Sequence, residues 1–143
     1  MYLDDIKIGS VINIENVVIE KDEMIDFSEK YNPARIHTDE EYAKTTRFGQ
    51  LLAPGMLTFM AVWRKYIPLD FAGGEFIAGT STSLEWTAPV FAGDVLRCAA
   101  EVTDKTFRNE HNGILTVNFN IYNQSDTLVL KAEVKSVVRR RGK

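Results

Sequence analysis

Alternating hydrophobic and polar residues predict strands, and the clearest runs lie near the end of the chain. Leu115, Val117, Phe119 and Ile121 alternate with polar or small residues, and residues 128–138 alternate again. Earlier strands are predicted at residues 11–19, 75–86 and 94–106. The turn sequences Asn112-Gly113 and Ser125-Asp126 separate the last three strands. Because short turns join them, these strands should pair antiparallel.

Helical spacing predicts two short helices in the first third of the chain. Apolar residues at helical spacing indicate an amphipathic helix over residues 22–31, which Asn32-Pro33 should end. A capping-box pattern over residues 38–41 should start a second helix, with Thr38 as its cap, that runs to about Thr45. The stretch between Asn32 and this cap is expected to be an irregular loop.

A third helix is predicted at residues 56–67, and it is apolar on nearly all sides. Its charged residues, Arg64 and Lys65, fall in the last turn, where they suit the helix dipole, and Pro68 should end it. A helix that is apolar all round is usually buried. The simplest architecture is therefore α+β: a single domain, residues 1–143, in which an antiparallel sheet wraps around a long buried central helix.

Composition narrows the class of protein. The 143 residues include 17 Lys and Arg against 20 Asp and Glu, which gives a net charge of −3. This mild acidity argues against nucleic acid as a partner. Cys98 is the only cysteine, so neither an internal disulfide nor a Cys-rich zinc site can form, and a reducing, cytoplasmic compartment is expected.

The two ends and the hydropathy profile give no sign of targeting to a membrane. The first ten residues carry acids and no long apolar run, unlike a signal peptide, and no stretch approaches the roughly 18–20 apolar residues of a membrane span. The basic cluster at residues 139–143 is interpreted as a solvated tail after the last strand.

Two segments carry residues that suggest chemistry. In the first, residues 31–39, the amide of Asn32 and the imidazole of His37 are five positions apart. In the second, residues 52–56, Gly55 opens the buried helix. A helix N-terminus offers unpaired N–H groups and the positive end of the dipole, and glycine lets a carbonyl oxygen approach closely. Such a site could stabilise the charge that develops on a thioester oxygen.

At these residues the sequence resembles the MaoC-like dehydratases, a hot-dog-fold family that includes the (R)-specific enoyl-CoA hydratases. The resemblance rests on residues 31–39, on Phe48-Gly49 leading to Gly55-Met56, and on residues 86–94, in which an aromatic residue is followed by Pro-Val and Gly-Asp. It covers most of the chain, and it implies a hot-dog fold and hydration of enoyl thioesters.

The resemblance also implies the site residues. In active hydratases an aspartate and a histidine five residues apart hold the water that adds to the double bond; His37 matches the histidine, and Asn32 stands where the aspartate would be. Gly55 matches the glycine of the oxyanion hole, and Pro54 stands where many members have a histidine. An amide cannot accept a proton as a general base, but Asn32 could orient the water while His37 acts as base.

Three functions follow as hypotheses. The leading one is a hydratase or dehydratase acting on enoyl-CoA or 3-hydroxyacyl-CoA, with CoA or acyl carrier protein as carrier and with no metal or redox cofactor. A thioesterase is the second, although the central helix lacks the carboxylate that many hot-dog thioesterases use. A non-catalytic acyl-CoA-binding protein is the third, supported by Asn32. The exposed edges of one sheet also predict a homodimer.

Overall fold

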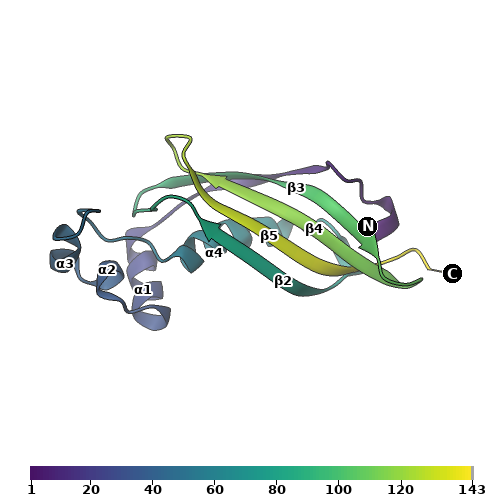
Figure 1. The fold of residues 1–143 in the computed structure, drawn as a ribbon, viewed down its shortest axis with the longest axis horizontal. Helices are drawn as coiled ribbons and strands as arrows, with labels where there is room; N and C mark the ends of the chain where they lie inside the picture. The colour runs from purple at the N-terminus through teal and green to yellow at the C-terminus, as the bar shows by residue number, and fades with distance from the viewer. Residues whose placement is uncertain (143) are drawn as a thin grey trace.

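Five strands form one antiparallel sheet, and a long helix lies against one of its faces (Figure 1). The computed structural model describes residues 1–142. The strands are β1 (Val11–Val18), β2 (Phe76–Trp86), β3 (Val95–Phe107), β4 (Asn112–Tyr122) and β5 (Leu128–Arg139). They lie in the order β1-β3-β4-β5-β2, and each neighbouring pair is antiparallel, as the alternation and the short turns predicted. This is the hot-dog fold.

The core is centred on β4, where a large residue faces small neighbours. Phe119 pairs in register with Ala100 on β3 and with Ala132 on β5, so both flanking strands leave room for its ring. Three aromatic rings of the long helix, α4 (Gly55–Tyr66), surround Phe119; the nearest, Tyr66, lies edge-on with ring centroids 4.9 Å apart. Edge-on aromatic pairs are favourable beyond their buried area. They hold α4 against the sheet.

The central helix is present as predicted, but one side of it is not covered. The residues that face the sheet are buried, among them Leu57, Phe59 and Val62. In contrast, Met56 and Met60 are 49% and 38% exposed, and Ile67, just beyond the helix, is 50% exposed. An open sheet of five strands can cover only one side of a helix, so the apolar residues of the other side have no partner among residues 1–142.

Three short helices gather at one end of the sheet, and both termini lie at the other (Figure 1). They are α1 (Lys21–Tyr31), α2 (Arg35–Thr38) and α3 (Glu40–Lys44). The irregular loop expected between Asn32 and Thr38 is wrong in part, because α2 begins at Arg35 and occupies three of its five residues. Single-turn 3₁₀ helices complete the chain: η1 (Leu3–Asp5), η2 (Ile67–Leu69) and η3 (Gly73–Glu75).

The predicted cap of α3 is displaced by one residue. Thr38 closes α2, and its hydroxyl donates to the carbonyl of Ala34. Asp39 caps α3 instead, since its Oδ1 accepts a 3.0 Å bond from the backbone N–H of Tyr42. The prediction of a capped helix at this place is therefore confirmed, but Thr38 belongs to the preceding helix α2.

The basic residues after the last strand are not a free tail. Arg140 forms a 3.1 Å ion pair with Asp4, and its guanidinium lies 3.7 Å from the centre of the Phe107 ring. Arg141 pairs with Asp5. These contacts attach the end of the chain to its first turn. Within residues 1–142, no helix combines the length and the apolarity needed to cross a bilayer.

Candidate active site

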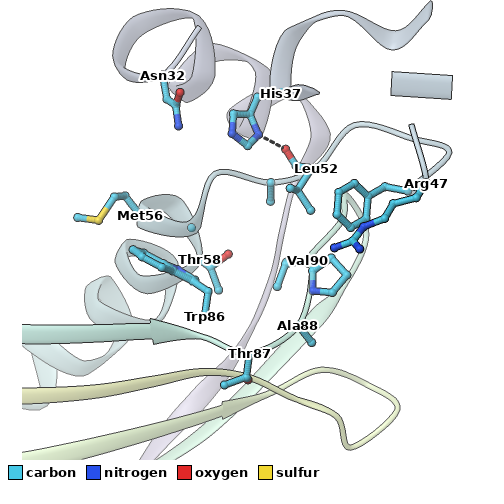
Figure 2. A pocket seen from close by; sticks show the side chains of 14 residues that line it. Asn32, His37, Arg47, Leu52, Met56, Thr58, Trp86, Thr87, Ala88 and Val90 are labelled. Carbon is cyan, nitrogen blue, oxygen red and sulfur yellow. Dashed lines mark hydrogen bonds between the residues drawn. The ribbon is translucent and has the colours of Figure 1, made fainter. Parts of the chain in front are cut away.

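A cavity of about 510 Å³ lies between the short helices, the start of α4 and the segment after β2 (Figure 2). That volume is within the range of small-molecule sites. Fourteen residues line it: Asn32, His37, Arg47, Phe48, Leu52, Ala53, Gly55, Met56, Thr58, Trp86, Thr87, Ala88, Pro89 and Val90. The fold thus brings all three site residues suggested by the sequence, Asn32, His37 and Gly55, to one cavity.

Backbone hydrogen bonds join the segments that carry these residues. The N–H of Leu52 donates to the carbonyl of Ile36, beside His37, at 3.1 Å. The N–H of Ala53 donates to the carbonyl of Val90 at 2.8 Å, and Leu52 also bridges to Phe91. The segment before α4 therefore holds the histidine on one side and the segment after β2 on the other.

His37 is held in a defined tautomer. Its side chain is buried on α2, and its Nδ1 lies 2.5 Å from the carbonyl oxygen of Leu52. A carbonyl oxygen can only accept, so Nδ1 carries the proton and donates it in this bond. In the neutral ring Nε2 is then unprotonated and can accept a proton. Figure 2 shows the ring turned with its free side toward Asn32.

The backbone of Asn32 ends a helix, whereas its side chain is free to bind a ligand. Its N–H ends α1 by donating to the carbonyl of Ser28 at 2.8 Å. Its amide group is exposed, lines the cavity opposite His37 (Figure 2), and forms no hydrogen bond within residues 1–142. The amide is thus able to hold a water or a polar ligand atom beside the imidazole.

Gly55 begins α4 at a helix N-terminus that no side chain caps. The capping position is Pro54, which contributes no side-chain hydrogen bond, so the N–H groups of Gly55 and Met56 remain available on the cavity side. A Cβ at Gly55 would lie only 2.3 Å from two atoms of the Trp86 indole. A side chain at this position would therefore displace either the indole, which packs directly on the start of the helix, or the helix itself.

Arg47, Thr58 and Trp86 also line the cavity and were not among the site residues predicted from the sequence. Trp86 is the first of residues 86–94, on which the family resemblance partly rests, so the sequence offered a signal for it. Thr58 follows Gly55 by one helical turn, a spacing that places both residues on the same face of the predicted helix. Arg47 is the only permanently charged residue in the lining, which contains no carboxylate. Within residues 1–142, no group of three His, Cys, Asp or Glu side chains is arranged to hold a metal ion.

Comparisons with known proteins identify the family of the chain. The model of the FAS1-like dehydratase domain region matches residues 7–132. An uncharacterised Bacillus subtilis protein, YdeM, is 33% identical over 141 residues, covering 98% of this chain and all of YdeM.

Two solved structures superpose closely on the chain. A MaoC-like dehydratase from Rhodospirillum rubrum has a TM-score of 0.88 at 27% identity and covers 100% of this chain and 99% of its own. A protein from Archaeoglobus named as a monoamine oxidase regulatory protein has a TM-score of 0.91 at 28% identity, with 98% and 95% covered. The chain therefore belongs to the FAS1-like dehydratase family and to the MaoC-like proteins of the hot-dog fold.

Proposed function

We propose that the protein hydrates enoyl thioesters, or dehydrates 3-hydroxyacyl thioesters in the reverse direction. The observation that carries the proposal is the orientation of His37, whose Nδ1–H donates to the Leu52 carbonyl and leaves Nε2 as an acceptor on the side of the uncommitted Asn32 amide. An imidazole and an uncapped helix N-terminus on the same cavity provide a base and a carbonyl site.

The reaction needs only one proton-transferring side chain. His37 Nε2 takes a proton from water as the water oxygen bonds to C3 of the enoyl group. The electron pair of the double bond moves toward the thioester carbonyl, where the N–H of Gly55 stabilises the negative charge. The His37 imidazolium then returns the proton to C2, so the net change is addition of H and OH. Asn32 orients the water and exchanges no proton.

The position of Arg47 favours a thioester whose carrier group is anionic. Arg47 is exposed, so it lies where the cavity opens to solvent, and the lining contains no acid that would neutralise it. Both CoA and the phosphopantetheine group of a carrier protein bring phosphate to such an opening, and arginine pairs well with phosphate. The thioester is thus expected to enter with its acyl chain toward Gly55.

A cytoplasmic location remains a prediction from the single, buried Cys98.

The test is hydration of crotonyl-CoA, followed by the loss of its conjugated absorbance. We expect wild-type turnover, and a fall of about 10²–10⁴ in kcat for His37→Ala because the only proton-transferring group is lost. Asn32→Asp should raise kcat, since it restores a second acid–base group beside the imidazole. His111→Ala is the matched control, because His111 is exposed at the β3–β4 turn and should leave turnover unchanged.

Each failure selects a different function. His37→Ala with wild-type turnover would refute the role of the histidine. Steady thiol release without hydration would indicate a thioesterase. An inactive wild type that binds CoA esters, with activity appearing only in Asn32→Asp, would indicate a binding protein that has lost its base.

We further propose that the protein is a homodimer. The edge strand β2 is exposed along nearly its whole length, including Phe76, Ile77 and Trp86, which are each 46–48% exposed. Trp86 packs on Gly55, so this edge adjoins the uncovered side of α4 that carries Met56 and Met60. Monomeric proteins rarely leave such a combination of free edge and apolar surface in water.

Light scattering at micromolar concentration tests the dimer. We expect twice the 16.2 kDa mass of one chain for the wild type and a substantial monomer fraction for Ile77→Lys. Val11→Lys is the matched control, because Val11 is an exposed apolar residue on the opposite edge strand, β1. A wild-type monomer, or equal dissociation of both variants, would contradict a β2-centred interface.

A further inference from the structure

Thr58 is the one cavity residue whose buried polar atom has no partner. Its side chain is 1% exposed, and Oγ1 forms no hydrogen bond although it is shielded from water. Leaving a buried hydroxyl without a partner costs about 1–3 kcal/mol. Within residues 1–142 the only other such side-chain atom is Oδ1 of Asn112, which does not line the cavity. The orphan at Thr58 therefore calls for a local explanation.

The partner that a helical threonine usually finds is already occupied. Threonine hydroxyls in helices commonly donate to the carbonyl four residues earlier, which for Thr58 is that of Pro54. That oxygen accepts two backbone bonds, from Leu57 N–H at 3.0 Å and from Thr58 N–H at 3.2 Å. Its two lone pairs are thus in use, so the Thr58 hydroxyl is left to pair with a group on the cavity side.

The position of Thr58 on α4 indicates what it would bind there. It lies one turn after Gly55, and side chains of a helix lean toward its N-terminus. Its hydroxyl is thereby directed over the first turn, beside the N–H groups that Pro54 leaves uncapped. In Figure 2 the hydroxyl projects into the space between Trp86 and Leu52, on the cavity side of the helix.

We infer that the Thr58 hydroxyl is a second donor to the thioester carbonyl, acting with the N–H of Gly55. The inference deepens the proposed function and rests on it for the identity of the ligand. The two groups differ in kind: a backbone N–H is fixed by the helix, whereas a hydroxyl can rotate to follow the oxygen as negative charge develops. Thr58 would then strengthen its bond in the transition state, which raises kcat rather than affinity.

The kinetic test compares Thr58→Val, which keeps the shape and removes the hydroxyl, with Thr58→Ser, which keeps the hydroxyl. With crotonyl-CoA we expect Thr58→Val to lower kcat by about 10²–10³ with little change in KM, and Thr58→Ser to recover most of the rate. Thr116→Val is the matched control, because Thr116 is also buried but lies on β4 away from the cavity. Wild-type kcat in Thr58→Val would overturn the inference.

Stability separates this role from a structural one. Since the hydroxyl has no protein partner, Thr58→Val should leave the Tm of the ligand-free protein unchanged or raised. A lower Tm together with an equal loss of activity in the valine and serine variants would show that the threonine serves packing, and would overturn the inference.

A saturated thioester keeps the inference testable even if the protein is not a hydratase. Butyryl-CoA has no double bond to hydrate, and its ¹³C-labelled carbonyl can be followed by infrared difference spectroscopy. We expect the carbonyl band of the bound ester to shift to lower frequency in the wild type and to shift less in Thr58→Val. Equal bands in both proteins would overturn the role of Thr58, whereas absent crotonyl-CoA turnover with unequal bands would refute only the proposed reaction.

Discussion

Single residues of this site owe their roles to what their neighbours leave free. His37 is a candidate base because Leu52 takes its other ring nitrogen, and Thr58 has a free hydroxyl because Pro54 is already occupied. Asn32 stands where the resemblance implies an aspartate, and its amide lines the cavity, where it can hold a water. Hydrogen bonds to the backbone of Leu52 and Pro54 thus determine which side-chain groups are left free in the cavity.

Gly55→Ala tests the close packing at the start of α4. The added Cβ would meet the Trp86 indole at 2.3 Å, so the ring or the helix must move. We expect a loss of about 10²-fold in kcat/KM for crotonyl-CoA, since small displacements of a catalytic group have effects of that size, together with a change in tryptophan fluorescence.

A glycine with room for a side chain provides the control for this substitution. Gly74 has no atom within 4 Å of an added Cβ, so Gly74→Ala should behave as wild type in both measurements. Normal activity and an unchanged fluorescence spectrum in Gly55→Ala would show that the indole adjusts freely, and that the helix start tolerates a side chain.

At the scale of elements, the short helices position the site and the sheet supports it. The α2 turn carries His37 to the cavity, and α3 follows it directly. The sequence correctly predicted a side-chain cap between these two turns, but it predicted the wrong residue. Thr38 is the last residue of α2, and Asp39 caps α3. Local hydrogen-bond competition between adjacent turns decides such boundaries.

Asp39→Ala tests the cap of α3. The bond from Tyr42 N–H to the Asp39 carboxylate satisfies a free donor of the helix, so its loss should lower the free energy of unfolding by about 1 kcal/mol, measured by urea denaturation. Thr38→Ala is the control: it removes a longer, 3.2 Å bond to Ala34 that caps no helix, and it should cost less. A larger loss of unfolding free energy in Thr38→Ala than in Asp39→Ala would indicate that Thr38 is the cap.

At the scale of the whole molecule, ion pairs join the two ends of the chain. The backbone N–H of Arg141 donates to the Asp4 carboxylate at 2.9 Å, and this bond, helped by the Arg140 side chain, holds the pKa of Asp4 below its usual value. In the pH range between the folded and ordinary pKa values the unfolded chain binds more protons than the folded one. The contribution of Asp4 to stability is therefore present above the ordinary pKa and lost as the pH falls through the folded pKa.

Asp4→Asn should accordingly be less stable than wild type at pH 7, and the difference should vanish in acid below the folded pKa. Urea denaturation at a series of pH values measures this. Asp26→Asn is the control, because Asp26 is an exposed acid of α1 that forms no salt bridge within the described residues. A stability difference for Asp4→Asn that is independent of pH would contradict the role of the charge.

The sequence alone determined the class of fold and the candidate residues. The period-two alternation over residues 115–121 and 128–138 predicted antiparallel strands, and an apolar run without strand periodicity predicted the central helix, because these patterns depend on local geometry. The spacing of Asn32 and His37 and the glycine before an apolar helix indicated the chemistry on the same local basis.

Only the tertiary structure decided which groups are free to act. The tautomer of His37 depends on Leu52, the need for glycine at position 55 depends on Trp86, and the orphan hydroxyl of Thr58 depends on the burial of α4 against the sheet. The uncovered side of α4 and the bare edge of β2 likewise follow from how far one open sheet can reach around a helix. These are properties of contacts between residues distant in sequence, and no local pattern records them.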